Sequence, residues 1–524
     1  MRELETSRHL FQRPLYHCPS GDWTYSFPEA LQHCGSEVHL DLPAVVSCLS
    51  FGFTCQNRTL LREVTRRPWL SRVTTGNEVV LEPVPPHGFR TDSDENLAKR
   101  FFDLLCDEAR AVCDGFKDIY ILLSGGLDSR IVAGVLARLW QQRELSAKPI
   151  AVTWGLPDSR DIAYASRMAK MLGFEWQHVP LGPETVLENI ETTVCQLGLL
   201  HSPEMLHNML WFKRIPPTAL VLAGSFGDSV GRAEFSGKHL LELRRRQPQN
   251  SYELLRPAVF GSACPAVIGD LDLTYSRAQG EVPPYARHEH WMQADRMRGG
   301  LCHALSVIST YARVYQMYTA PEVYGFMWSL HPARRNDEIY AALLENETPD
   351  LARIPWPRTN RALRGRTLGA ERHLRPDYHE YTMWSSGPLY SQLHSRIDPE
   401  WFAATGLFEA ASIRKMDELV RASTVRVGVL NYVWLWLAGF RTFVECLEKT
   451  GKKLVIEARE TAESSPGGVR REPRRKMWVL AASKAPFVNS ALRTVRHHCR
   501  RIRLRWLKRQ ALNAYPSVPA DGRY

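Results

Sequence analysis

The stretch that decides the fold is Ile119-Tyr-Ile-Leu-Leu-Ser-Gly-Gly-Leu-Asp-Ser-Arg-Ile-Val-Ala133. It begins with a continuous apolar run, which predicts a buried strand, and helical spacing starts directly after the loop. Two adjacent glycines, Gly125 and Gly126, allow the backbone to turn sharply and to approach a ligand closely. The N–H groups of the loop and the helix N-terminus then converge on one point, which suits a polyphosphate. Asp128 would repel a phosphate by itself, so its presence there predicts a bridging Mg²⁺.

Outward from this stretch, short apolar runs alternate with helical patterns. The expected strands cover residues 118–123, 149–154, 175–181 and 219–223, and the expected helices cover residues 93–117, 130–140, 158–172 and 184–197. This alternation predicts an α/β fold with a parallel sheet that helices cover on both faces. Residues 230–450 are expected to be mostly helical. Residues 1–92 are expected to be rich in short strands, among them 45–53 and 77–82.

Length and charge divide the chain into three expected parts. The 524 residues, 44% hydrophobic and 23% charged, have the composition of a globular protein with more than one domain. We expect a small β-rich region at 1–92, a nucleotide-binding domain at 93–460 and a basic tail at 461–524. Residues 463–524 hold 15 Lys and Arg against three Asp and Glu, whereas the rest of the chain is nearly neutral.

The end of the tail has the pattern of a basic amphipathic helix. The simplest interpretation is a solvated segment or one packed on the body. Attachment to an anionic membrane surface or to an acidic partner is the alternative.

Cysteine usage indicates the compartment. The chain has 11 cysteines and no Cys-x-x-Cys pair, which favours reduced thiols over a disulfide framework. The charged N-terminus does not predict a signal peptide, and apolar stretches such as 429–440 are too short to span a bilayer. We therefore expect a cytoplasmic protein.

The loop lacks the Gly-Lys-Ser/Thr ending of a Walker loop. It resembles the pyrophosphate loop (PP-loop) of ATP pyrophosphatases, which cleave ATP between the α- and β-phosphates. Over roughly residues 40–445 the chain resembles the asparagine synthase family. Ala151-Val-Thr-Trp-Gly155 is similar to the family's second strand, which contacts adenine, and Val221-Leu-Ala-Gly-Ser-Phe-Gly-Asp-Ser229 is similar to its serine- and glycine-rich turn. The resemblance implies a sheet of the adenine-nucleotide α-hydrolase type, a large helical C-terminal half, and ATP and Mg²⁺ as cofactors.

The resemblance also implies roles for particular residues. Asp128 and Asp228 would share the Mg²⁺ and act as catalytic residues. Arg358 ends a segment similar to the one that brings a catalytic Lys to the phosphates, and would supply positive charge there. Asp161 stands where the family enters its second helix through an acidic residue. The expected ATP contacts are Leu123, Ser124, Gly125, Gly126, Asp128, Ser129, Thr153, Gly155 and Gly224.

The implied activity is that of an ATP-dependent, AMP-forming amide ligase. A substrate carboxylate attacks the α-phosphorus of ATP, pyrophosphate leaves, and an amine attacks the acyl-adenylate. The partners would be a carboxylate substrate and an amine donor, with an ammonia-supplying or peptide partner as further options. No specific nucleic acid is expected.

The chain departs from the family in its nitrogen source and in its cation. Glutamine-dependent members place a nucleophilic Cys where this chain has Arg2, and the region before the loop is about half the usual length. We therefore expect no glutamine hydrolysis, and Cys18 could replace the nucleophile only after removal of a propeptide. No Lys stands at the family's position, where Arg358 or Arg361 would supply the charge instead.

A third departure concerns the base that activates the amine in β-lactam-forming relatives. The usual acidic residue is missing, and Gln316 or Met317 stands near its place. Tyr315 and Glu322 are nearby alternatives. These departures fit a specialised relative, such as a lasso-peptide-type macrolactam cyclase or a modifier of surface-polymer carboxylates. Two other classes stay open, which are an RNA-modifying PP-loop enzyme, slightly favoured by the basic tail, and a non-catalytic ATP-binding protein.

Overall fold

The computed structural model describes residues 7–457 except 89, 91, 234–246, 278–283, 333 and 424–427. The predicted basic tail and its amphipathic pattern lie outside the described residues. Within the described part of the chain, no helix is both long and apolar enough to cross a membrane. The ten cysteines in that part are all free.

The centre of the molecule is a five-stranded parallel sheet in the order β11-β10-β7-β8-β9. Its strands are β7 (Ile119–Leu122), β8 (Ile150–Gly155), β9 (Glu175–Pro180), β10 (Leu220–Ala223) and β11 (Arg313–Gln316). All residues of β7 and β10 are buried, as expected for central strands with both faces covered. The predicted α/β fold is confirmed.

The chain order creates a switch point in this sheet. From β7 the chain continues to β8 on one side, whereas from β10 it continues to β11 on the other side. The chain therefore leaves β7 and β10 toward opposite edges of the sheet, and the carboxyl ends of these two neighbouring strands form its topological switch point. Open parallel sheets bind ligands at such a place.

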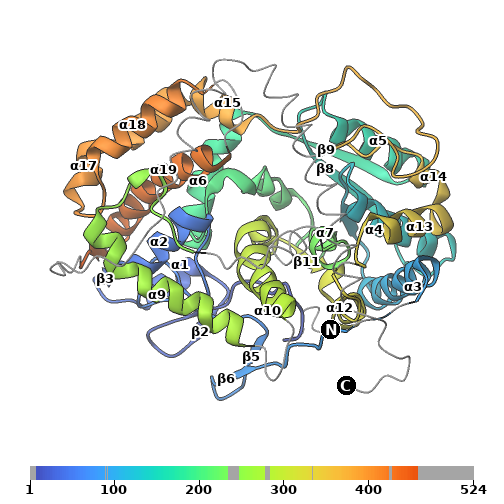
Figure 1. Ribbon diagram of the computed structural model, residues 1–524, viewed down its shortest axis with the longest axis horizontal. Coiled ribbons are helices and arrows are strands. Elements are labelled where there is room, and N and C mark those ends of the chain that lie inside the picture. The colour runs from blue at the N-terminus through green and yellow to red at the C-terminus, as the bar shows by residue number, and fades with distance from the viewer. Residues whose placement is uncertain are drawn as a thin grey trace.

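Helices form at the predicted positions. They are α3 (Asp94–Cys113), α4 (Leu127–Gln141) and α5 (Arg160–Leu172), which share the core of the sheet, and α6 (Pro183–Leu197), which packs on α19 (Gly428–Lys449) in a second core. The α3 helix begins where the Ser93 side chain accepts a hydrogen bond from the Asn96 N–H, and its apolar face enters the core around the sheet. In Figure 1, α3, α4 and α5 lie in the same half of the molecule as β8 and β9, and α3 packs against α4 and α13.

A second core joins the beginning of the described chain to its end. The N-terminal elements are β1 (Tyr16–His17), β2 (Trp23–Thr24), α1 (Phe27–Gln32), β3 (Glu37–His39), α2 (Leu42–Phe51), β4 (Thr65–Arg66), β5 (Ser71–Val73) and β6 (Val79–Leu81). Strand β3 pairs in parallel with β12 (Lys453–Val455). Apolar side chains from α1 and α2 share one core with α19 (Gly428–Lys449), on the side of Figure 1 opposite α3.

The expectation of a strand at residues 45–53 is wrong, because α2 covers most of that stretch. Pro43 occupies the first turn of the helix, where its missing N–H costs nothing, and the helix ends at Gly52 with φ 93°. Seven of its ten residues are buried. A short apolar run without a polar face has no periodicity that separates a buried helix from a buried strand. The strand expected at 77–82 is present as β6.

The predicted helical half is confirmed. The remaining helical elements of the described part of the chain are η1 (Pro203–Leu206), η2 (Met209–Arg214), α7 (Gly227–Val230), η3 (Ser251–Glu253), α9 (Pro257–Ser276), α10 (Pro284–Trp291), the π-helix η4 (Met292–Leu301), α11 (His303–Ile308), η5 (Met317–Thr319), α12 (Pro321–Trp328), α13 (Asp337–Glu347), α14 (Pro349–Ala352), α15 (Tyr381–Ser386), α16 (Tyr390–Arg396), α17 (Pro399–Ala404) and α18 (Ala410–Arg421).

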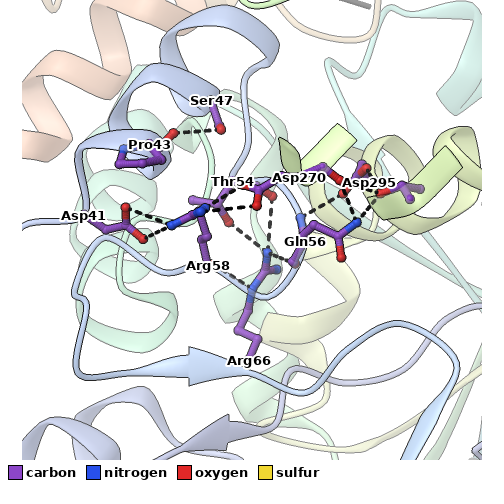
Figure 2. Close-up of polar contacts among 10 residues, drawn as sticks. Asp41, Pro43, Ser47, Thr54, Gln56, Arg58, Arg66, Asp270 and Asp295 are labelled. Atoms are coloured by element: carbon purple, nitrogen blue, oxygen red, sulfur yellow. Dashed lines mark hydrogen bonds and ion pairs between the residues drawn. The ribbon is translucent and has the colours of Figure 1, made fainter. Parts of the chain in front are cut away.

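Buried polar contacts tie the N-terminal region to this helical half (Figure 2). The Arg58 guanidinium contacts both Asp41, 2.9 Å away, and Asp270 of α9, 2.5 Å away. The Gln56 N–H donates to Asp295 Oδ1 of η4 (2.9 Å). Burial raises the pKa of Asp295 to about 6. Because each carboxyl here is enclosed and bonded, the N-terminal segment is held in one position against α9 and η4.

Candidate functional site

The loop between β7 and α4 is folded back on itself by two serines. The Ser124 N–H donates to Ser129 Oγ (3.1 Å), and the Gly126 N–H donates to Ser124 Oγ (3.1 Å). Ser129 Oγ donates to the Ser124 carbonyl (3.2 Å). Just before the loop, the Leu123 N–H donates to the Val152 carbonyl (2.9 Å), which continues the sheet to the loop's first residue. The loop therefore has a defined shape at the carboxyl edge of the sheet.

Gly125 is enclosed from two sides. A Cβ at this position would lie 2.4 Å from Pro357 Cγ and 3.3 Å from the Asp161 Cα, so a larger residue would displace the loop. The Asp161 carboxylate of α5 accepts a hydrogen bond from the Gly125 N–H. That bond lowers the pKa of Asp161, but burial has the larger effect and raises this pKa to about 6.

Arg130 of α4 fastens the loop to a distant segment. Its side chain is 1% exposed, and Nη2 donates to the carbonyls of Gly125 (2.8 Å) and Pro355 (3.0 Å). Nη1 donates to the carbonyls of Ile354 (2.7 Å) and Leu351 (3.1 Å). Burial lowers the pKa of Arg130 to about 10. One buried guanidinium thus sets the position of segment 351–355 relative to the loop.

Asp128 and Asp228 follow neighbouring strands. Asp128 is the second residue of α4, after β7, and Asp228 is the second residue of α7, after β10. Both side chains are half-buried. A Cβ on Gly227 would lie 2.5 Å from Asp128 Oδ1, so the Asp128 carboxylate contacts the turn that carries Asp228. The structure therefore brings the two predicted metal ligands to the switch point of the sheet.

Arg232 is the cation that contacts Asp128. Its Nη2 lies 3.2 Å from Asp128 Oδ2, and its Nη1 lies 3.5 Å from Asp337 Oδ1. The guanidinium is stacked near two aromatic rings, 5.3 Å from the centroid of Tyr340 and 5.5 Å from that of Trp356. The side chain is 5% exposed, so its charge acts in a protein environment of low polarity, where electrostatic effects are strong.

Two buried tyrosines hold the backbone around these carboxylates. The Tyr318 hydroxyl donates to the Asp128 carbonyl, and the Tyr340 hydroxyl donates to the Gly227 carbonyl, each at 2.9 Å. Burial raises the pKa of both tyrosines well above its usual value. Both phenols therefore stay protonated and act as fixed donors.

The segment after α14 brings Arg358 to the same place. The Arg358 guanidinium lies 4.8 Å from the centroid of Trp356, the ring that Arg232 also approaches. Arg358 is exposed, and its charge lowers the pKa of Asp161. Arg361, the other predicted cation, is exposed as well. Arg358 is thus a solvent-facing charge beside the buried charge of Arg232.

The remaining predicted nucleotide contacts lie at the ends of β8 and β10. Thr153 is buried, and its hydroxyl accepts a hydrogen bond from Trp176 Nε1 (3.1 Å). The carbonyl of Gly155 lies 2.8 Å from His178 Nε2. Gly224 packs directly on the first turn of α4, because a Cβ there would lie 3.1 Å from the Ser129 nitrogen. Thr153 and Gly155 belong to β8, on the side of the loop away from Asp228.

Gln316 ends strand β11, next to Ala223 of β10. Its side chain is 2% exposed, and neither its amide nitrogen nor its amide oxygen has a hydrogen-bond partner among the described residues. Tyr315 instead is bonded to Glu108 and to His9 Nε2, and Glu322 is exposed at the start of α12. Gln316 is therefore a buried polar group at this sheet edge that can hydrogen-bond a ligand.

Sequence reasoning missed Arg130 and Arg232. A signal for Arg130 was present, because it stands in an apolar helix segment where a charge needs several partners to be buried. Arg232 had no such signal. Its role depends on Asp337 and Trp356, which lie more than 100 positions away in the sequence.

Comparisons with known proteins give one family match. Residues 103–323 match the family model described as asparagine synthase. These residues run from α3 to α12 and include the loop, Asp128, Asp228 and Arg232. No curated protein matches the chain. The solved structure of U34-tRNA thiolase NcsA from Methanococcus maripaludis, with its [4Fe-4S] cluster, is 15% identical and covers 50% of this chain and 81% of that chain, with a TM-score of 0.20.

Proposed function

We propose, from the match of residues 103–323 to the asparagine synthase family model, that the chain is an ATP-dependent, AMP-forming amide ligase of the cytoplasm. The proposal includes the three-part division at residues 92 and 460. The observation that carries the proposal is the convergence at one sheet edge of the 123–129 loop, two carboxylates and two arginines.

The 123–129 loop, Asp128 and Asp228 fit a nucleoside triphosphate bound together with Mg²⁺. The described residues contain no group of three or more His, Cys, Asp or Glu arranged to hold a metal ion. Mg²⁺ commonly uses only one or two protein carboxylates and completes its shell with phosphate oxygens and water. Asp128 and Asp228 would hold it, and when bound it would neutralise charge on the phosphates.

The chain's own residues would act mainly by alignment and charge. The backbone N–H groups of the loop and the first turn of α4 would bind the departing pyrophosphate. Arg232 and Arg358 would stabilise the negative charge that develops as the bond between the α-phosphorus and the bridging oxygen breaks. Arg130 and Asp161 would hold the loop in place through Gly125, so that the substrate carboxylate meets the α-phosphorus in line.

The second half of the proposed reaction joins an amine to the acyl group. The amine nitrogen attacks the acyl carbon, AMP leaves, and the nitrogen loses a proton. Gln316 cannot serve as a base, since an amide does not accept a proton at neutral pH. It would instead hydrogen-bond the acyl substrate or the amine, and in this proposal the proton of the amine passes to water.

The nitrogen source in this proposal is ammonia, another amine or a partner protein. Cys18 is buried, and burial raises the pKa of its thiol, so the structure offers no support for it as a glutaminase nucleophile. A peptide that carries both the carboxylate and the amine would make the enzyme a macrolactam cyclase.

The test is adenylation of a carboxylate panel that includes aspartate and a peptide side-chain carboxylate. Purified protein with MgATP and hydroxylamine should form a hydroxamate with the true substrate and release pyrophosphate. The Asp128→Ala/Asp228→Ala double variant is the negative control. Hydroxamate that forms equally well with this double variant would contradict the proposed site.

One observation favours a second candidate, a protein that binds ATP without turning it over. Arg232 already contacts Asp128 at 3.2 Å, where a metal ion would need that carboxylate. If the guanidinium keeps Mg²⁺ away, ATP binding would be independent of Mg²⁺ and no AMP would form. Isothermal titration of ATP with and without Mg²⁺ separates this candidate from the ligase.

A further inference from the structure

Two cysteines outside the candidate site lie close together near the surface. Cys195 is on α6 and Cys446 is on α19, 251 positions apart, and their sulfur atoms are 4.0 Å from each other. Cys195 is exposed and Cys446 is partly exposed, whereas seven of the other eight described cysteines are buried and Cys264 is intermediate. The pair is therefore open to reagents that the buried thiols cannot meet.

The hydrogen bond between the two thiols favours a thiolate on one sulfur and a proton on the other. A hydrogen bond from the Cys195 thiol is the main cause that lowers the pKa of Cys446, to about 7, and Lys449 one turn further along α19 acts in the same direction. Burial and Glu191 oppose this shift. The same hydrogen bond raises the pKa of Cys195. Near neutral pH, Cys446 therefore carries substantial thiolate while Cys195 keeps its proton, and the thiolate is the reactive form.

A cavity of about 380 Å³ opens beside these sulfur atoms, and both cysteines line it. The rest of its wall is largely apolar, with Phe27, Leu31 and Phe443 among its residues, and Lys452 also lines it. The cavity offers space for a small group attached to one sulfur. Lys452 suits a carboxylate on that group.

We propose that Cys195 and Cys446 form a reversible thiol–disulfide site that reacts with low-molecular-weight disulfides carrying a carboxylate, such as glutathione disulfide. The sulfur atoms must approach from 4.0 Å to about 2.05 Å for a bond to form. The proposal therefore requires the two sulfur atoms, which lie at the contact between α6 and α19, to move about 2 Å toward each other.

The exchange takes place in two balanced steps. The Cys446 thiolate attacks one sulfur of the small disulfide, which breaks its S–S bond and releases one thiolate. Cys195 then loses its proton and attacks the Cys446 sulfur of the mixed disulfide, which releases the second small thiol. The two protein thiols are oxidised, and the small disulfide is reduced to two thiols.

The test uses the full-length protein and glutathione disulfide, with no nucleotide present. Non-reducing peptide mass spectrometry should find a linked peptide pair containing Cys195 and Cys446, and dithiothreitol should remove it. In Cys195→Ser the reaction should stop at a glutathione adduct on Cys446. In Cys446→Ser the remaining Cys195 should react with glutathione disulfide at least tenfold more slowly than Cys446 does in Cys195→Ser. Cys264→Ser, a matched partly exposed control, should behave as wild type.

Two results would overturn the proposal. The first is stable glutathione adducts on both cysteines of the wild-type chain without any linked pair. The second is a Cys195 thiol in Cys446→Ser that reacts with glutathione disulfide as fast as Cys446 does in Cys195→Ser. If a serine variant fails to fold, differential isotope labelling of the wild-type thiols after graded oxidation decides the question, because coupled cysteines must be lost together. The readout is independent of ATP, so it neither requires nor tests the ligase proposal.

Discussion

Replacement of Arg232 by Gln probes the buried cation at the candidate site. The change removes a guanidinium that is 5% exposed and lies 3.2 Å from Asp128 and 3.5 Å from Asp337. A hydrogen bond to a charged group contributes about 1.5–3 kcal/mol, so we expect a stability loss of about 2 kcal/mol. Against a typical stability of about 10 kcal/mol, that loss leaves the protein folded.

The expected effect on catalysis is larger than the effect on folding. A preorganised donor aimed at developing negative charge contributes about 100-fold to 1,000-fold in kcat, so pyrophosphate release should fall about 100-fold in Arg232→Gln. The assay follows pyrophosphate at saturating MgATP and substrate, with circular dichroism to confirm folding. Arg138→Gln is the matched control, because it removes another arginine of a carboxylate pair, with Glu347, at the far end of α4.

An unchanged or increased rate in Arg232→Gln would refute the reasoning. A higher rate together with a lower Mg²⁺ concentration for half-maximal rate would show that Arg232 occupies the metal position instead of stabilising charge on the phosphates. If the wild-type chain also released no pyrophosphate, the second candidate, a nucleotide-binding protein without turnover, would then be the better account.

Three further variants test the neighbouring parts of the site. Gly125→Ala should lower ATP affinity at least tenfold, because the new Cβ would lie 2.4 Å from Pro357 Cγ, whereas Gly261→Ala, with no atom within 4 Å, should be neutral in the same titration calorimetry. The raised pKa of Asp161, about 6, means that the folded state binds its proton more tightly than the unfolded state, so this group's stabilising contribution is lost as pH rises through 6. Asp161→Asn should therefore gain about 1 kcal/mol over wild type between pH 5 and 7.5 in urea unfolding, and equal pH slopes would contradict this assignment. Gln316→Ala should raise KM for the carboxylate or the amine about tenfold with little change in ATP affinity, and an unchanged KM for both would remove Gln316 from the substrate site.

The sheet was predictable from the sequence because parallel strands are buried on both faces. The runs at β7 and β10 are continuously apolar, and the helices between the strands have one apolar face, so each type of element has its own pattern. The same reasoning failed at α2, which is a helix buried on most sides. There the local sequence lacks a polar face, and the contacts with α9 and α19 decide the outcome.

The candidate site was predictable where its residues follow strands directly. The loop, Asp128 and Asp228 depend on local sequence and on the rule that parallel strands present their carboxyl ends at one edge. Arg130 and Arg232 could not be assigned, because their partners Pro355 and Asp337 come from the helical half, far away in the chain. The proximity of Cys195 to Cys446 could not be predicted from the sequence for the same reason, because 251 positions separate them.

The most direct test of the central claim is the identity of the product formed from ATP labelled at the α-phosphate. With Mg²⁺ and a carboxylate found by the hydroxamate screen, the account predicts labelled AMP and one equivalent of pyrophosphate, both lost in Asp128→Ala/Asp228→Ala. Labelled ADP with free phosphate would contradict it, because cleavage would then fall between the β- and γ-phosphates and the adenylation mechanism would be wrong.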